Sequence, residues 1–115
     1  MKVYVAGPYT APTAREVQAN VNRALEVACA LMRKGHSVYI PHLSHYVWLH
    51  PDGDFSYEYW LQQSLVWLDE CDALFFIGPS PGSDQERAYM ESGWWHRVYV
   101  GPRKVYTSLD EVPDA

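Results

Sequence analysis

The chain has 115 residues, of which 48% are hydrophobic and 20% are charged, and its formal net charge is −5. This composition fits one folded domain over residues 1–115 and argues against intrinsic disorder. Nine Lys and Arg stand against fourteen Asp and Glu, so the chain lacks the basic surface that a nucleic acid polymer would require of its partner.

No apolar run approaches the ~18 residues of a membrane-spanning helix, so no membrane partner is expected. Cys29 and Cys71 are isolated in the sequence, and we expect both on the buried sides of helices. Unpaired thiols in apolar surroundings favour a reducing compartment, whereas a disulfide is the alternative. The expected location is therefore cytoplasmic.

The first elements are defined by clear boundaries. Residues 2–6 are apolar and β-prone, and they predict a strand that ends at a Gly-Pro pair. Thr13 and Glu16 have the spacing of a capping box, which begins a helix that Gly35 ends. Residues 37–40 predict a second short strand.

The second half repeats this alternation. Residues 41–54 predict a long loop, and apolar side chains then recur at helical spacing from Tyr57 to Cys71. Residues 72–77 are almost wholly apolar, as in a strand covered on both faces. The remaining expected elements are a turn at 78–82, a helix at 83–94, strands at 97–100 and 104–106, and one helical turn in the tail 108–115.

Strands that alternate with helices predict an α/β fold: a doubly wound parallel sheet of four or five strands with helices on both faces. If the strand order is 2-1-3-4-5, the order reverses between the first and third strands. Ligands bind such sheets at the carboxyl ends of the strands beside that reversal. The loops expected there are residues 7–9 and 78–82.

The turn after the third strand carries the strongest candidate for chemistry. Gly82 allows a ligand close to the backbone, and the amides that follow it form a helix N-terminus, which binds anions. Glu86 is expected in the first helical turn, where the macrodipole favours the carboxylate that a nucleophile requires. Alternatively, Ser83 and Glu86 form a capping box, in which Glu86 serves only the backbone.

Three segments together resemble the nucleoside 2-deoxyribosyltransferase-like superfamily, in particular its small bacterial and phage branches. They are Tyr4-Val-Ala-Gly-Pro-Tyr9, Cys71-Asp-Ala-Leu74 and Ser80-Pro-Gly-x-x-x-Glu86. The resemblance implies a flavodoxin-like fold. It also implies cleavage or transfer at the N-glycosidic bond of a nucleoside or nucleoside 5′-monophosphate, as a hydrolase or transferase without a cofactor.

By motif match, Glu86 is the catalytic nucleophile that bonds to the anomeric carbon. In the family, Ser80 corresponds to a phosphate-contacting position, and Gly7 and Tyr9 correspond to a loop that cradles the base or sugar. Arg15 follows that loop, within reach of a 5′-phosphate. The expected substrate-binding residues are Gly7, Pro8, Tyr9, Arg15, Ser64, Ser80, Gly82 and Ser83.

One position departs from the family pattern. Catalytic members carry an Asp on the second helix where this chain has Ser64. Ser64 shares an apolar stripe with Leu61 and Leu65, so we expect it to face the site or the core. A serine does not replace a carboxylic acid at neutral pH. Either Asp69 or Asp54 supplies the acid, or the protein is a non-catalytic nucleotide-binding sensor on the same fold.

The loop at 41–54 contains His42, His45 and His50 beside two aspartates. Their spacing matches no metal motif, so no metal site is expected. The favoured alternative is a lid in which His45, Tyr46 and Trp48 fold over a ligand and a histidine donates a proton near neutral pH.

Aromatic residues make up 15% of the chain, including five Trp. A chain of this length cannot bury all of them, and Trp is common at subunit interfaces. We therefore expect a homodimer or higher homo-oligomer, with the excess around Trp48, Trp60, Trp94 and Trp95. A purely structural role for this aromatic surface is the weakest alternative.

Overall fold

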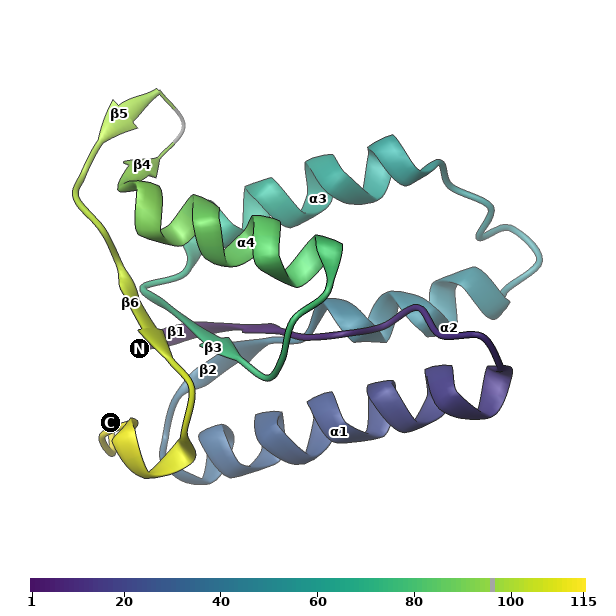
Figure 1. The fold of residues 1–115 in the computed structure, drawn as a ribbon, viewed down its shortest axis with the longest axis horizontal. Helices are drawn as coiled ribbons and strands as arrows, with labels where there is room; N and C mark the ends of the chain where they lie inside the picture. Colours follow the sequence, from purple (N-terminus) through teal and green to yellow (C-terminus); the bar gives the residue numbers. More distant parts are fainter. Residues whose placement is uncertain (96) are drawn as a thin grey trace.

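The computed structural model describes residues 1–95 and 97–115. Four parallel strands form its main sheet, in the order β2-β1-β3-β6. Three helices pack on this sheet, with α1 on one face and α3 and α4 on the other (Figure 1). The α/β doubly wound fold is thus confirmed, with four strands. The strands are β1 (Lys2–Ala6), β2 (Ser37–Tyr39), β3 (Ala73–Phe76) and β6 (Lys104–Tyr106).

The helices begin and end close to the expected residues. The longest is α1 (Ala14–Arg33), whose first turn is capped by the Thr13 side chain, and α3 (Tyr57–Glu70) is capped by Ser56. Cys29 lies on the exposed side of α1, so its expected burial is wrong, whereas Cys71 is buried at the end of α3. The other helices are α2 (Ser44–Leu49) and α4 (Pro81–Ser92), with short 3-10 turns η1 (Pro41–Leu43) and η2 (Leu109–Glu111).

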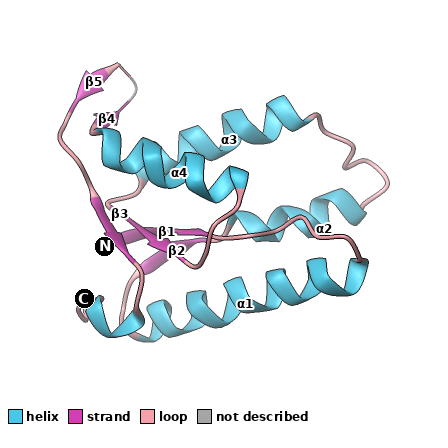
Figure 2. Ribbon diagram, in the orientation of Figure 1, coloured by secondary structure: helices cyan, strands magenta, loops and turns pink. Residues whose placement is uncertain are grey.

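Two expectations about elements are wrong. The segment at 41–54 is not a plain loop, because η1 and α2 occupy its first half (Figure 2). Residues 97–100 do not join the parallel sheet. Instead β4 (Trp94–Trp95) and β5 (Val98–Tyr99) form a small antiparallel pair, and β6 takes the fourth place in the sheet. Gly93 explains the difference, since its positive φ of 80° turns the chain back immediately after α4.

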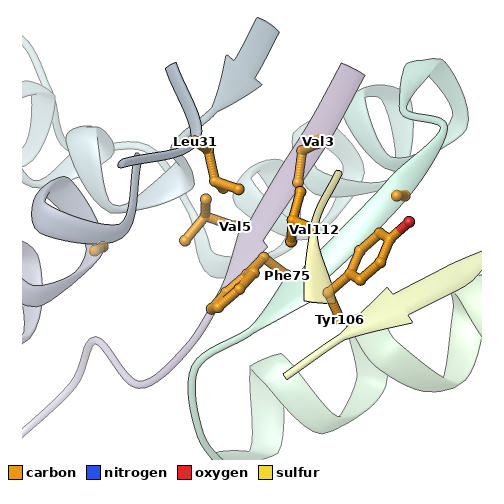
Figure 3. Close-up of a cluster of buried hydrophobic side chains, with 8 residues drawn as sticks. Val3, Val5, Leu31, Phe75, Tyr106 and Val112 are labelled. Carbon is orange, nitrogen blue, oxygen red and sulfur yellow. The ribbon is translucent and has the colours of Figure 1, made fainter. Parts of the chain in front are cut away.

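Side chains alternate across the central strands. Val3 and Val5 point toward α1 and meet Leu31, Phe75 and other apolar side chains there (Figure 3). Tyr4 and Ala6 point to the opposite face, where α3 and α4 pack. This period of two is the reason that a polar phenol from β1 reaches the α4 side of the sheet.

The strand order reverses between β1 and β3, which are neighbours in parallel register. The chain leaves β1 toward β2 on one side and leaves β3 toward β6 on the other. The loop after β1 and the turn after β3 therefore meet at one edge of the sheet, as expected. Both segments contribute to the cavity described next.

Candidate functional site

A cavity of about 680 Å³ lies at this edge. Its walls come from the loop after β1, from η1, from α3 and from the start of α4. The volume lies in the usual range for small-molecule sites, which are mostly apolar with a few polar groups. The aromatic and apolar lining residues are Tyr9, Tyr57, Trp60, Leu61, Leu65, Leu68 and Tyr89, and the polar ones include His42, Ser64, Ser80, Ser83 and Glu86.

Glu86 lines this cavity from α4. The helix begins at Pro81, two residues earlier than expected, because Ser80 is its N-cap and proline needs no hydrogen-bond partner in the first turn. Glu86 therefore lies beyond the first turn. Ser83 is inside the helix rather than at its cap, so the capping-box interpretation of Glu86 is wrong.

The ionisation of Glu86 also differs from the expectation. Burial raises the pKa of its carboxyl to about 7, and the hydrogen bond from Tyr4 offsets only part of this effect. The expectation that the helix N-terminus keeps Glu86 ionised is wrong, since the carboxyl lies too far along α4 and is desolvated. Near neutral pH both protonation states are populated.

Tyr4 connects Glu86 to Ser64. The Tyr4 phenol is fully buried and donates a hydrogen bond to the Glu86 carboxyl. Burial, followed by the Glu86 charge, raises the pKa of Tyr4, while a side-chain hydrogen bond with Ser64 lowers it. Ser64 is half-buried and lines the cavity, which confirms its expected placement. Three side chains from β1, α3 and α4 thus form one polar cluster at the cavity wall.

The serines at the start of α4 hold the turn together. The Ser80 hydroxyl accepts a hydrogen bond from the Ser83 amide at 3.1 Å, and the Ser83 hydroxyl donates to the Gly78 carbonyl at 2.9 Å. Both serines also line the cavity. A Cβ added at Gly82 would meet no atom within 4 Å. The backbone at Gly82 therefore remains open to close approach by a ligand.

Two histidines hold the loop after β1. The buried His42 donates from Nε2 to the carbonyls of Gly7 at 3.1 Å and Pro8 at 3.2 Å. Burial lowers its pKa, so its ring is neutral at pH 7. Asn20 donates to the Tyr9 carbonyl at 3.0 Å, and His45 contacts the Tyr9 hydroxyl.

The expected histidine lid has a different arrangement. His45 is buried against Tyr9, whereas Tyr46 and Trp48 on the same helix are exposed. His50 lies 3.8 Å from Asp52 at the surface. Within residues 1–95 and 97–115, no group of three or more His, Cys, Asp or Glu side chains is placed to hold a metal ion.

Seven of the nine expected site residues line the cavity: Gly7, Tyr9, Ser64, Ser80, Gly82, Ser83 and Glu86. Pro8 and Arg15 are not among its lining residues. Pro8 contributes its carbonyl to the His42 hydrogen bond, and Arg15 is exposed near the start of α1.

Sequence reasoning missed two tyrosines. Tyr4 was placed in a strand and in a shared motif without a role of its own, although a hydroxyl in a strand buried on both faces signals a polar partner. Tyr89 lines the cavity and donates a hydrogen bond to Asp69, a candidate acid that is half-buried. Asp54, the other candidate acid, is exposed and does not line the cavity.

Comparison with known proteins places the chain in a family. The model of a domain of unknown function, DUF7768, matches residues 1–94. The chain belongs to the DUF7768 family. The part that matches this family includes every residue lining the cavity, and it ends before β5 and β6. No curated protein matches the chain.

Proposed function

We propose that this DUF7768 protein cleaves or transfers the N-glycosidic bond of a nucleoside or nucleoside 5′-monophosphate, with Glu86 as the nucleophile. The observation that carries the proposal is the Glu86 carboxyl in the wall of a largely apolar cavity, hydrogen-bonded by the buried Tyr4 phenol. The motifs shared with nucleoside 2-deoxyribosyltransferase-like proteins support the same assignment.

The chemistry requires the carboxylate form of Glu86. As the base departs with the electron pair of the C1′–N bond, the sugar gains oxocarbenium character, and a carboxylate stabilises this charge and bonds to C1′. Water or a second base then takes the sugar and releases Glu86. Since the pKa of Glu86 is about 7, the reactive form increases as the pH rises through neutrality.

The cavity suits a flat base joined to a polar sugar. Trp60, Tyr57 and Tyr9 offer aromatic surface for a base. Gly82 and Ser83, at the start of α4, line the same cavity, and a helix N-terminus favours an anion. This combination supports a nucleotide as the ligand.

The test measures base release from a panel of nucleosides and 5′-monophosphates. Glu86→Gln should lower the rate by about 10³-fold or more, because the amide is not an anionic nucleophile. Asp84→Asn is the matched control, since it removes a carboxylate from an exposed position of the same helix and should leave the rate unchanged. Parental activity in Glu86→Gln would assign the reaction to another residue.

Ser64 favours a second candidate, a non-catalytic nucleotide sensor. This side chain lines the cavity at the position where catalytic relatives of the superfamily carry an acid. A sensor would be stabilised by nucleotides against thermal unfolding and would release no base from any of them. Base release distinguishes the two candidates.

We also propose that the protein acts as a homodimer in the cytoplasm. Large aromatic side chains remain exposed on α2 and on the β4–β5 pair, including Trp48, Trp94 and Trp95, whereas Trp60 is half-buried in the cavity wall. Both cysteines are free thiols, as a reducing compartment favours. No helix in the described part of the chain has the length and hydropathy to cross a membrane.

Sedimentation at micromolar concentration tests the dimer. Val98→Lys places a charge on the exposed β5 strand and should shift the parental dimer toward monomer, whereas Glu26→Lys on the exposed part of α1 should not. A monomeric parent protein would contradict the proposal.

A further inference from the structure

A second polar pair adjoins the cavity, on the loop after β1. Tyr9 lines the cavity, and its hydroxyl oxygen lies 2.9 Å from Nδ1 of His45. The two rings meet edge to face, with centroids 5.8 Å apart. Burial raises the pKa of Tyr9, so the phenol keeps its proton at neutral pH. A tyrosine in the cavity wall thus has its hydroxyl hydrogen-bonded to a buried imidazole.

The surrounding contacts hold both members of the pair in place. The Asn20 side chain bonds the Tyr9 carbonyl at 3.0 Å. His45 is only 7% exposed and packs against the rings of Tyr46 and Trp48 on α2. A catalytic group held by such packing and hydrogen bonding needs little reorganisation during reaction.

The proposed reaction needs a proton donor other than Glu86, Ser64 and the two candidate aspartates. A departing base takes up a proton, yet Glu86 must be ionised to attack C1′. Ser64 is not an acid at neutral pH. Asp69 accepts a hydrogen bond from Tyr89, and Asp54 is exposed away from the cavity.

We propose that Tyr9 protonates the departing base and that His45 replaces the proton on Tyr9. This inference rests on the proposed function. The C1′–N bond breaks with its electron pair going to the base, and one Glu86 oxygen bonds to C1′. The Tyr9 hydroxyl proton passes to a base nitrogen, and His45, in its imidazolium form, gives its Nδ1 proton to the Tyr9 oxygen and is left as a neutral imidazole.

The second half of the reaction restores the pair. Water attacks C1′ and the ester bond to Glu86 breaks, so that the carboxylate is released. The proton lost by the water passes through Tyr9 to His45. Tyr9 is therefore a catalytic residue, and His45 acts through it.

Two substrates whose departing bases differ in their need for a proton can test this assignment. The substrates are 2′-deoxyguanosine 5′-monophosphate and its N7-methyl derivative, whose base departs as a neutral molecule without an added proton. Tyr9→Phe removes the donor. His45→Asn keeps an amide near the Nδ1 position but does not titrate. His50→Asn makes the same change at an exposed histidine immediately after α2 and is the control.

Tyr9→Phe and His45→Asn should lower kcat on the unmodified nucleotide by about 10²-fold or more. On the methylated nucleotide each should lose less than about tenfold, and His50→Asn should match the parent on both. Equal losses on the two substrates would overturn the inference and leave a structural role for the pair, and so would parental rates on both.

Failure of the proposed function has a different signature. A parent that releases no base from these two substrates or from any member of the panel overturns the proposed function and this inference with it. If Glu86→Gln retains the parental rate, Glu86 is not the nucleophile, yet selective loss in Tyr9→Phe would still identify the proton donor. If Glu86→Gln is inactive and the Tyr9 variant loses both substrates equally, only the inference fails.

Discussion

The Tyr4 phenol donates a hydrogen bond to the Glu86 carboxyl, across 82 residues of sequence. This bond joins β1 to α4 between the sheet and the cavity. Tyr4 is fully buried, and Glu86 reaches the cavity from the other side of the bond. The ionisation of the proposed nucleophile therefore depends on a buried side chain that is not among the residues lining the cavity.

Tyr4→Phe should raise the pKa of Glu86 above its present value of about 7, because the phenol stabilises the carboxylate. Titration of the Glu86 carboxyl carbon by NMR measures this shift. The free energy of unfolding should fall by about 1 kcal/mol through loss of one buried hydrogen bond. Tyr106→Phe, in the core on the opposite face, is the control and should leave the pKa of Glu86 in place.

The raised pKa of Glu86 makes stability depend on pH. The folded protein holds this proton up to about pH 7, whereas the unfolded chain loses it near 4.5. Between these values the folded state binds more protons, so the contribution of Glu86 to stability falls as the pH rises from 4.5 to 7. The loss is at most about 3 kcal/mol and is complete above pH 7.

Glu86→Gln should remove this dependence, since the amide does not ionise. Urea unfolding at pH 5 and at pH 8 measures it: the variant should be more stable than the parent at pH 8 and should differ less from it at pH 5. A variant whose stability follows the parent at both pH values would show that Glu86 is not desolvated in the folded protein.

Substitution by alanine should have opposite effects on stability at Gly93 and at Gly82. Gly93 has a φ of 80°, and an added Cβ would lie 2.7 Å from the Tyr99 ring and 2.9 Å from the Gly101 carbonyl carbon. Gly93→Ala should therefore cost roughly 1–2 kcal/mol or more of folding free energy.

Gly82→Ala should behave in the opposite way. Its methyl group meets no protein atom within 4 Å, and alanine favours helix, so the melting temperature should hold or rise slightly. The methyl group intrudes on the cavity, however, and nucleotide binding should weaken. A Gly82→Ala protein with parental affinity would show that ligands do not approach the start of α4.

Ser64→Asp supplies the carboxyl found at the corresponding position in catalytic members of the superfamily that the sequence motifs resemble. Ser64 faces the cavity beside Tyr4, so the new side chain is placed to act on a ligand. We expect it to preserve or raise the rate of base release, measured at pH 8, where Glu86 is ionised despite the added negative charge. Ser64→Ala is the control, because it removes the hydroxyl without adding an acid. A folded but inactive Ser64→Asp would contradict the expectation.

The sheet was predictable because residues close together in the sequence specify each of its strands. Short segments of sequence specify each element: apolar runs mark strands at 2–6 and 72–77, a capping box at Thr13 begins a helix, and Gly35 ends it. The alternation of strands and helices then leaves few possible topologies. The same reasoning brought the loop after β1 and the turn after β3 to one edge. It failed at 97–100, where apolar β-prone residues pair with Trp94 and Trp95 instead of with the sheet.

The cavity chemistry depended on contacts that sequence spacing does not encode. The helix α4 begins two residues before the expected position. This shift places Glu86 in the cavity wall and not in a capping box. Its protonation is then decided by burial and by Tyr4, which arrives from β1 through the alternation of the strand. By itself the sequence determined the strands, the helices and the edge at which they meet. Only tertiary structure decided the charge state of Glu86 and the partner of His45, because desolvation and hydrogen bonding depend on which distant side chains come together.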